Sequence, residues 1–226
     1  MFERTRNNII SLIFAIALVI LIISFSIGLP IYNRTFYYIH VLVLDLPEET
    51  GYEYSEITEA YDEVLDYLTI DGKEFGTGIL EHSEEGKAHF EDCKKLFDLN
   101  KNALIISLAI VILLIVFDKV GLITLARPCG LRLGFWSSIV TLSLFSFVGL
   151  ACAVNFDSAF TTFHKLFFPG KSNWMFDPYA DEIILVLPQQ FFLSCAVLIC
   201  VSVLLISAIL IARAIIKRND EYAWRV

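Results

Sequence analysis

Long apolar blocks alternate with charged segments along the chain. Four of these blocks hold enough apolar residues to cross about 30 Å of hydrocarbon, which takes roughly 20 residues of helix. They predict spanning helices over residues 9–31, 102–125, 133–155 and 183–212. The first block is much longer than the roughly 7–15 apolar residues of a secretion signal, and no small-x-small cleavage site follows it. We therefore expect it to be retained as a helix.

The predicted spans leave five connecting segments of very different lengths. Residues 1–8, 126–132 and 213–226 are an arm, a turn and a tail, each too short to hold a domain, whereas residues 32–101 and 156–182 are longer. We expect residues 32–101 to form a small, mainly helical domain and residues 156–182 to form a loop with a helix at the membrane surface. The predicted fold class is an all-α membrane protein with four transmembrane helices.

Local patterns within residues 32–101 predict a short strand and two helices. Aromatic and β-branched residues are dense from Thr35 to Leu46, which suggests a strand ended by Pro47. Apolar residues then recur at helical spacing from Tyr54 to Leu68. A second helix follows Ser83, which serves as its N-cap, with acidic residues in the first turn.

Aromatic residues mark the second long segment, 156–182. They predict a short amphipathic helix lying among the lipid headgroups. The stripe with helical spacing consists of Phe156, Ala159, Phe160, Phe163 and Phe167. Trp174, Phe176 and Tyr179 follow before the chain re-enters the membrane, and Lys165 and Lys171 are placed to meet lipid phosphates.

Composition and charge support a membrane protein and orient it. Apolar residues make up 57% of the 226 residues and mean hydropathy is +0.67, too high for a soluble domain. Residues 1–8, 118–132 and 213–226 hold nine Lys and Arg against four Asp and Glu, whereas residues 30–101 and 157–182 hold eight against twenty-one. Because positive residues beside short loops stay in the cytoplasm, we expect both termini inside and the long segments outside the cell membrane. The acidic exterior argues against a nucleic-acid partner.

Five cysteines do not form a disulfide framework in this topology. Cys93 alone lies in a predicted exterior segment, whereas Cys129 lies in the cytoplasmic turn and the others lie in spans. The sequence contains neither CxxC nor HExxH, and it lacks Gly-x-Ser-x-Gly, Walker A and dinucleotide motifs. We therefore predict no metal and no cofactor.

Histidines are the natural candidates for proton transfer, and all four lie in the predicted exterior segments. His40 and His82 have no suggestive neighbours. His89 has Asp92 three residues later, where a carboxylate can fix the imidazole tautomer, although such a pair on a charged helix is more often a solvated contact. His164 lies among phenylalanines, where desolvation favours the neutral ring. The alternative for His164 is a residue at the polar edge of an amphipathic helix.

Two motifs around these histidines resemble a known family. The run His89-Phe-Glu-Asp92-Cys-Lys94 is similar to the HMxDVK-type motif of the lipoprotein intramolecular transacylases, the Lit family of low-GC Gram-positive bacteria. The second signature of that family is similar to Phe160–Phe168, Trp174, Phe176–Pro178, Asp181 and Leu187–Phe192. The resemblance covers nearly the whole chain. Two positions depart from it, since Cys93 replaces an expected aliphatic residue and Gly86 an expected acid.

The resemblance implies an acyltransferase that works on the outer leaflet. Its substrate would be a diacylglyceryl-modified lipoprotein, whose sn-2 acyl chain moves to the free α-amine of the N-terminal cysteine and leaves the lyso form. By this resemblance His89 and His164 are the catalytic pair. Supporting or substrate-binding roles fall to Asp92, Phe163, Trp174 and Asp177. Ester-to-amide transfer is downhill and needs neither nucleotide nor metal, and a protein need only position two groups of one lipid.

Two other functions compete with the transacylase. A non-enzymatic tetraspan scaffold or assembly factor would bind a partner protein through residues 32–101 and would show an exposed apolar patch there. A transporter requires polar residues inside several spans, and the strongest candidates, Gln189 and Gln190, lie near the outer end of the fourth. The sequence predicts no oligomeric state.

Overall fold

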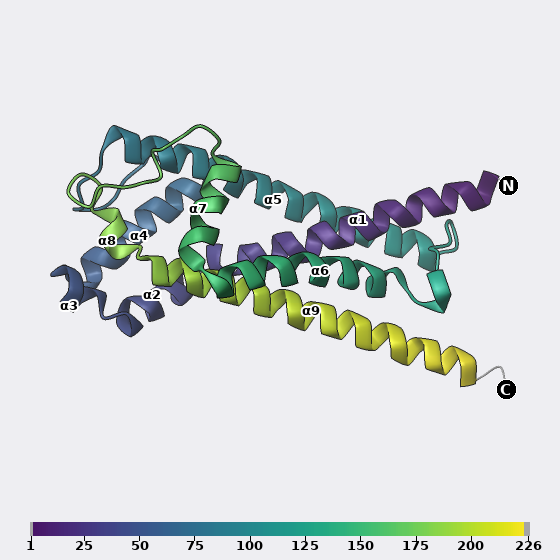
Figure 1. Ribbon diagram of the computed structural model, residues 1–226. Helices are drawn as coiled ribbons and strands as arrows, with labels where there is room; N and C mark the ends of the chain where they lie inside the picture. Colours follow the sequence, from purple (N-terminus) through teal and green to yellow (C-terminus); the bar gives the residue numbers. More distant parts are fainter. Residues whose placement is uncertain (1, 224–226) are drawn as a thin grey trace. The chain divides into compact units, whose positions relative to one another are not determined.

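The computed structural model describes residues 2–223, and all regular structure within that range is helical (Figure 1). The chain divides into two compact units. We call the first the span unit; it consists of Met1–Ile27, Lys101–Gly149 and Ile199–Val226. We call the second the head unit; it consists of Gly28–Asn100 and Leu150–Leu198. Residues 224–226, the end of the predicted cytoplasmic tail, lie outside the described range.

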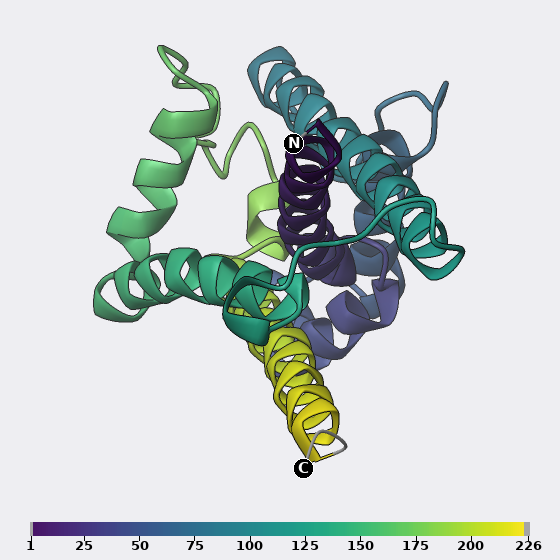
Figure 2. The same cartoon turned by 90° about the vertical axis from the view of Figure 1, so that its right-hand side faces the viewer.

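Four helices are long and apolar enough to cross a membrane, which confirms a multi-pass membrane protein with the predicted number of spans in the described range. They are α1 (Phe2–Ile31), α5 (Glu84–Lys119), α6 (Leu133–Val154) and α9 (Gln189–Ala223). The first residues of α1 face the viewer in Figure 2. The apolar part of α5 begins only after Lys101, because the residues before it are densely charged. We therefore treat α5 from Asn102 onward as its spanning segment.

Two predicted span boundaries differ from the helices. The span predicted over residues 183–212 is divided into α8 (Ile183–Val186) and α9, because Pro188 cannot donate a helical hydrogen bond. The span predicted to end at residue 125 stops as a helix at Lys119, since Gly121 adopts a left-handed conformation with φ of 78°. The short 3₁₀ turn η1 (Pro128–Gly130) lies in the predicted cytoplasmic turn.

The span unit is held by a small apolar core and by a polar contact between helices. Leu18 and Ile22 of α1, Val111 of α5 and Val203 of α9 are buried in one cluster. The Ser137 hydroxyl of α6 donates to the Ala15 carbonyl of α1 over 3.1 Å. Serine suits a contact between two spanning helices because its small side chain lets the helices approach closely.

The head unit has its own aromatic core, built by α2 (Arg34–Val43), α3 (Leu46–Thr50), α4 (Tyr54–Thr69) and α8. Tyr37 is fully buried, stacks on Tyr61 with ring centres 3.7 Å apart, and donates its hydroxyl to the Val186 carbonyl over 2.7 Å. The predicted strand over Thr35–Leu46 is wrong, since these residues form α2 and the start of α3. Tyr37 and Val41, one helical turn apart, both pack into the core, so tertiary packing overrides the aromatic and β-branched composition.

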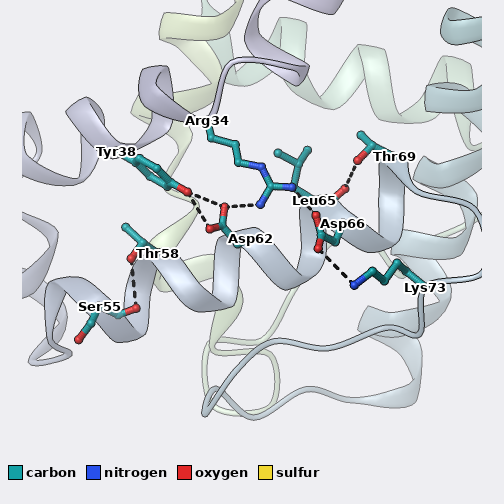
Figure 3. Close-up of polar contacts among 9 residues, drawn as sticks. All are labelled: Arg34, Tyr38, Ser55, Thr58, Asp62, Leu65, Asp66, Thr69 and Lys73. Carbon is teal, nitrogen blue, oxygen red and sulfur yellow. Dashed lines mark hydrogen bonds and ion pairs between the residues drawn. The ribbon is translucent and has the colours of Figure 1, made fainter.

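An ion-pair network joins the start of α2 to the exposed side of α4 (Figure 3). Arg34 pairs with Asp62 over 2.7 Å and also with Asp66. Tyr38 donates its hydroxyl to both oxygens of Asp62, and Lys73 lies 3.6 Å from Asp66. Because these groups are partly exposed, the network mainly fixes the orientation of α2 on α4 rather than adding much stability.

The remaining predicted helices are present in the head unit. Ser83 caps α5, because its hydroxyl accepts a hydrogen bond from the Gly86 N–H over 2.9 Å. The amphipathic helix is α7 (Phe156–Phe167), capped by Asn155, whose side chain accepts from the Ser158 N–H over 2.8 Å. The functional candidates lie on these two helices and on the loop that follows α7.

Candidate active site

His89 lies on the first part of α5 and is only 6% exposed. The edges of two rings enclose it, with Phe168 and Phe176 at 5.0 and 5.4 Å between ring centres. Its Nε2 atom lies 3.3 Å from the sulfur of Cys93, one helical turn later. Its Nδ1 atom is buried and has no hydrogen-bond partner.

His164 is the buried residue of α7, also 6% exposed. Trp174, from the loop that follows α7, stacks on the imidazole with ring centres 4.6 Å apart and planes 25° apart. Phe160 packs at 4.3 Å on another side. The alternative for His164, a residue at the polar edge of the helix, is therefore not what the structure shows.

The two histidines meet in the head unit. Their ring centres are 5.7 Å apart and their planes 35° apart, and Phe168 contacts both. The structure thus brings together the two residues that the family resemblance paired. His40 and His82 lie elsewhere: the first packs on Phe36 of its own helix, and the second bonds to Thr77 over 3.0 Å.

Hydrogen bonding fixes the proton position on His164. Its Nδ1 atom lies 2.8 Å from the Phe160 carbonyl oxygen. A carbonyl can only accept, so Nδ1 must carry the proton and donate. In the neutral ring the Nε2 atom then has a free lone pair, which is the form that a general base requires.

Burial keeps both imidazoles neutral. Desolvation and the neighbouring His164 lower the pKa of His89 to about 4, against the opposing effect of Asp92. Desolvation likewise lowers the pKa of His164, although its hydrogen bond to Phe160 acts in the other direction. Both rings are therefore uncharged near pH 7, and neither needs to lose a proton before it can accept one.

Asp92 pairs with two lysines and not with His89, the partner expected from its spacing. Its two oxygens face Lys95, at 2.9 Å, and Lys171, in the loop after α7. Hydrogen bonds from these lysines lower the pKa of Asp92 to about 2. Because Nε2 of His89 faces sulfur and Nδ1 is unpartnered, Asp92 does not orient that imidazole; it ties the loop to α5.

A second tie joins the end of the same loop to the N-terminus of α5. Asp181 accepts from the backbone N–H of Ser83 at 2.8 Å and from its hydroxyl at 2.9 and 3.0 Å. The next residue, Glu182, accepts from the Glu81 N–H over 2.8 Å. A carboxylate at a helix N-terminus is favourable because the terminal N–H groups and the helix dipole attract negative charge.

The other predicted supporting residues have distinct positions. Phe163 is half exposed and contacts His164 at 5.4 Å between ring centres. Trp174 covers His164, as described above. Asp177 is exposed and accepts from the Tyr179 N–H over 3.0 Å, so it shapes the turn rather than the space beside the histidines.

Sequence reasoning missed two contacts of this site. The tie between Asp92 and Lys171 spans 79 positions, and nothing local could reveal it. The contact between Cys93 and His89 has helical i, i+4 spacing, so the sequence did contain its signal.

A depression of about 390 Å³ lies between the start of α5 and the loop, beside Ala88. Charged and polar side chains form its walls together with apolar surface, and the lining residues are Glu84, Glu85, Ala88, Gly170, Lys171, Ser172 and Asn173. Within residues 2–223, no three His, Cys, Asp or Glu side chains are grouped as a metal ion would require.

Comparisons with known proteins give the family and the fold. The profile of the family described as "Lipoprotein intramolecular transacylase Lit" matches residues 12–192. Among solved structures, the membrane-integral Lit of Bacillus cereus matches with a TM-score of 0.86 at 24% identity, covering 97% of this chain and 100% of that chain. A variant of that protein with a histidine-to-arginine mutation matches with a TM-score of 0.79 at 24% identity, covering 98% and 96%. No curated protein sequence matches the chain.

Fold and site together define a membrane-integral acyltransferase with two apposed neutral histidines. Because the family profile covers most of its length, the chain belongs to the lipoprotein intramolecular transacylase family, Lit. The predicted reaction is thereby confirmed: the sn-2 acyl chain of a lipoprotein's diacylglyceryl cysteine moves to the α-amine of that cysteine. The alternatives of a non-enzymatic scaffold and of a transporter are set aside by the same finding.

Proposed function

We propose that His89 and His164 carry out this acyl transfer, with His164 as the general base. The observation that carries the proposal is the apposition of the two buried imidazoles, 5.7 Å apart between ring centres. An α-amine with a pKa of about 8 is mostly protonated at neutral pH and must lose protons in order to attack an ester. The lone pair on Nε2 of His164, set by the Phe160 carbonyl, can accept the proton released as the amine attacks.

The atoms balance without any further reactant. The ammonium group first releases one proton to the solvent. The neutral amine nitrogen then bonds to the sn-2 ester carbonyl carbon, and a second proton passes from it to His164. As the tetrahedral intermediate collapses, the bond from that carbon to the glycerol oxygen breaks and the proton returns to the departing alkoxide. In this proposal the His89 ring lies beside the ester oxygens, and its N–H group stabilises the negative charge of the intermediate. Holding both groups of one lipid in this geometry makes the attack effectively unimolecular and so lowers its barrier.

The supporting residues position the lipid in this proposal. The exposed faces of Phe163, Leu166 and Phe167 on α7 would enter the acyl-chain region, with Lys165 at the headgroups. The depression beside Ala88 offers polar side chains that suit the peptide following the modified cysteine. The Asp92–Lys171 tie holds the loop that carries Trp174 over His164.

The active site lies on the extracytoplasmic face in this proposal, with both termini in the cytoplasm, as the charge distribution predicts. A membrane-impermeant maleimide tests the orientation in intact cells. The exposed native Cys129 should react only after permeabilisation, and a Tyr179→Cys variant lacking Cys129 should react from outside. Labelling of Cys129 in intact cells would contradict the proposed orientation.

The assigned reaction is tested with purified protein and synthetic diacylglyceryl lipopeptide. Substrate and product are isomers of equal mass, so the readout is alkali lability: two chains of the substrate are ester-linked, but only one chain of the product. Two lipopeptides, one with isotope-labelled acyl chains and one with a labelled peptide, should yield no crossed product. Crossed products, or two alkali-labile chains after incubation, would contradict intramolecular transfer of the sn-2 chain.

A further inference from the structure

The partly buried Cys93 has no part in the mechanism above, yet its thiol contacts a catalytic candidate directly. Its sulfur lies 3.3 Å from Nε2 of His89, at i, i+4 spacing on α5. The other charged or titratable groups that act on His89 are His164 from α7, Asp92 from α5 and Lys171 from the loop.

The surroundings of Cys93 suit a hydrogen-bond donor and not a nucleophile. Burial raises the pKa of the Cys93 thiol to about 12, with a smaller contribution from Asp92. The thiolate is the reactive form of cysteine, and it is scarce at neutral pH in such a site. Cys93 is therefore a neutral thiol with one S–H group to donate.

The unpartnered Nδ1 atom of His89 decides between the two ring tautomers. Thiol sulfur is a weak acceptor, so an S–H group that donates to an unprotonated Nε2 is the better pairing than an N–H group aimed at sulfur. That pairing leaves the proton on Nδ1, which is buried and has no acceptor in the free protein. A buried donor without a partner is costly, and a substrate carbonyl oxygen would relieve that cost.

We propose that Cys93 is a positioning residue whose S–H group donates to Nε2 of His89 and keeps the proton on Nδ1. His89 is then an N–H donor toward the ester oxygens, which offer only acceptors, while His164 remains the base. This inference rests on the proposed role of His89. It gives the two histidines opposite tautomers, each set by a neighbour on its own helix: Phe160 for His164 and Cys93 for His89.

Three cysteine variants of the full-length protein separate the possible roles. Cys93→Val removes the donor with little change in volume, Cys93→Ser keeps a hydroxyl donor, and Cys195→Val is the control, a half-buried cysteine elsewhere in the head unit. With the lipopeptide assay we expect Cys93→Val to lower kcat by about threefold to tenfold at unchanged KM, the effect of one lost weak hydrogen bond. Cys93→Ser and Cys195→Val should stay within about twofold of the wild type.

The direct readout is the tautomer of His89, measured by ¹⁵N NMR of the imidazoles in the wild-type protein. We expect protonated Nδ1 and unprotonated Nε2, and in Cys93→Val a shift toward protonated Nε2. A wild-type His89 protonated at Nε2 would overturn the inference whether or not any variant folds. Loss of all activity in both Cys93 variants would also overturn it, in favour of a thioester intermediate. If His89→Ala remains active, the proposed function fails instead, whereas the tautomer result stands.

Discussion

Replacing His164 with alanine should lower kcat for acyl transfer by about 10²–10⁴-fold, the usual contribution of a general base. The Phe160 carbonyl holds Nδ1 protonated, so Nε2 of His164 presents a lone pair from a neutral ring. Among the rings that contact His164 within residues 2–223, only His89 has such a lone pair, and its Nε2 already faces a thiol. The measurement is conversion of the synthetic lipopeptide by the purified variant, followed as loss of one alkali-labile chain. KM should change little, because the lipid is bound mainly through its acyl chains.

His40 provides a matched control for this substitution. Its Nδ1 atom lies 2.7 Å from the carbonyl of Phe36, four residues earlier on its helix, so its local geometry copies that of His164. Its ring neighbours in the described part of the chain are Phe36 and Phe191 rather than a second histidine, and His40→Ala should keep at least about half of the wild-type kcat. His89→Ala should lose about 10²–10³-fold, the usual cost of removing an oxyanion donor. A His164→Ala enzyme that keeps more than a tenth of the activity would refute the base assignment.

Gly86→Ala should destabilise the protein, although alanine is the better helix former. A Cβ atom at this position would stand 2.7 Å from Cγ of Asp181 and still closer to Oδ1. Asp181 cannot easily move, because its carboxylate bonds to the backbone and hydroxyl of Ser83 at the start of α5. We expect a cost of about 1–3 kcal/mol from overpacking and the weakened cap, against a gain of up to about 1 kcal/mol in helix propensity. Thermal unfolding in detergent should show a melting temperature lower by about 2–10 °C.

Gly149→Ala is the control for helix propensity. A Cβ atom there would meet only the Cys200 sulfur at 3.7 Å, an ordinary contact, so its melting temperature should stay equal or rise. In an Asp181→Ala background the substitution at Gly86 should cost little more, because the clash has been removed. If Gly86→Ala alone melts at or above the wild-type temperature, the claim that Asp181 leaves no room for a Cβ atom at position 86 is contradicted. The same approach explains why Gly86 stands where the family resemblance led us to expect an acid.

The sequence predicted the helices whose apolar residues follow a clear period. Apolar residues at helical spacing predicted α4 and α7, because burial on one side of a helix imposes that spacing, whereas the length of the apolar blocks predicted the four spans. For the segment Thr35–Leu46 the composition predicted a strand, and the structure has a helix instead. Its aromatic and β-branched residues have strand propensity, but Tyr37 and Val41 are buried against α4 and α8 as a helix. Strand propensity was the only local signal in this segment, and packing against residues distant in the sequence determined its helical conformation.

The candidate site could be predicted only in part from local patterns. Spacing alone could not join His89 to His164, which are far apart in the chain, and the family resemblance supplied that pairing. Local spacing suggested that Asp92 orients His89, yet Lys171 and Lys95 occupy its oxygens. A charged lysine forms a stronger hydrogen bond with a carboxylate than a neutral imidazole does. Helical spacing considers only neighbours three or four residues away, whereas Lys171 is 79 positions from Asp92.

The most direct test of the catalytic pair is tandem mass spectrometry of lipoprotein N-termini from cells that express the protein. Fragmentation locates each acyl chain on the glyceryl group or on the cysteine nitrogen. Cells with the wild-type protein should contain N-acyl, S-monoacylglyceryl cysteine, and cells with His89→Ala or His164→Ala, at equal protein level, should contain only the diacylglyceryl form with a free amine. Lyso-form lipoprotein in cells carrying either alanine variant would contradict the assignment of these two histidines to the chemistry.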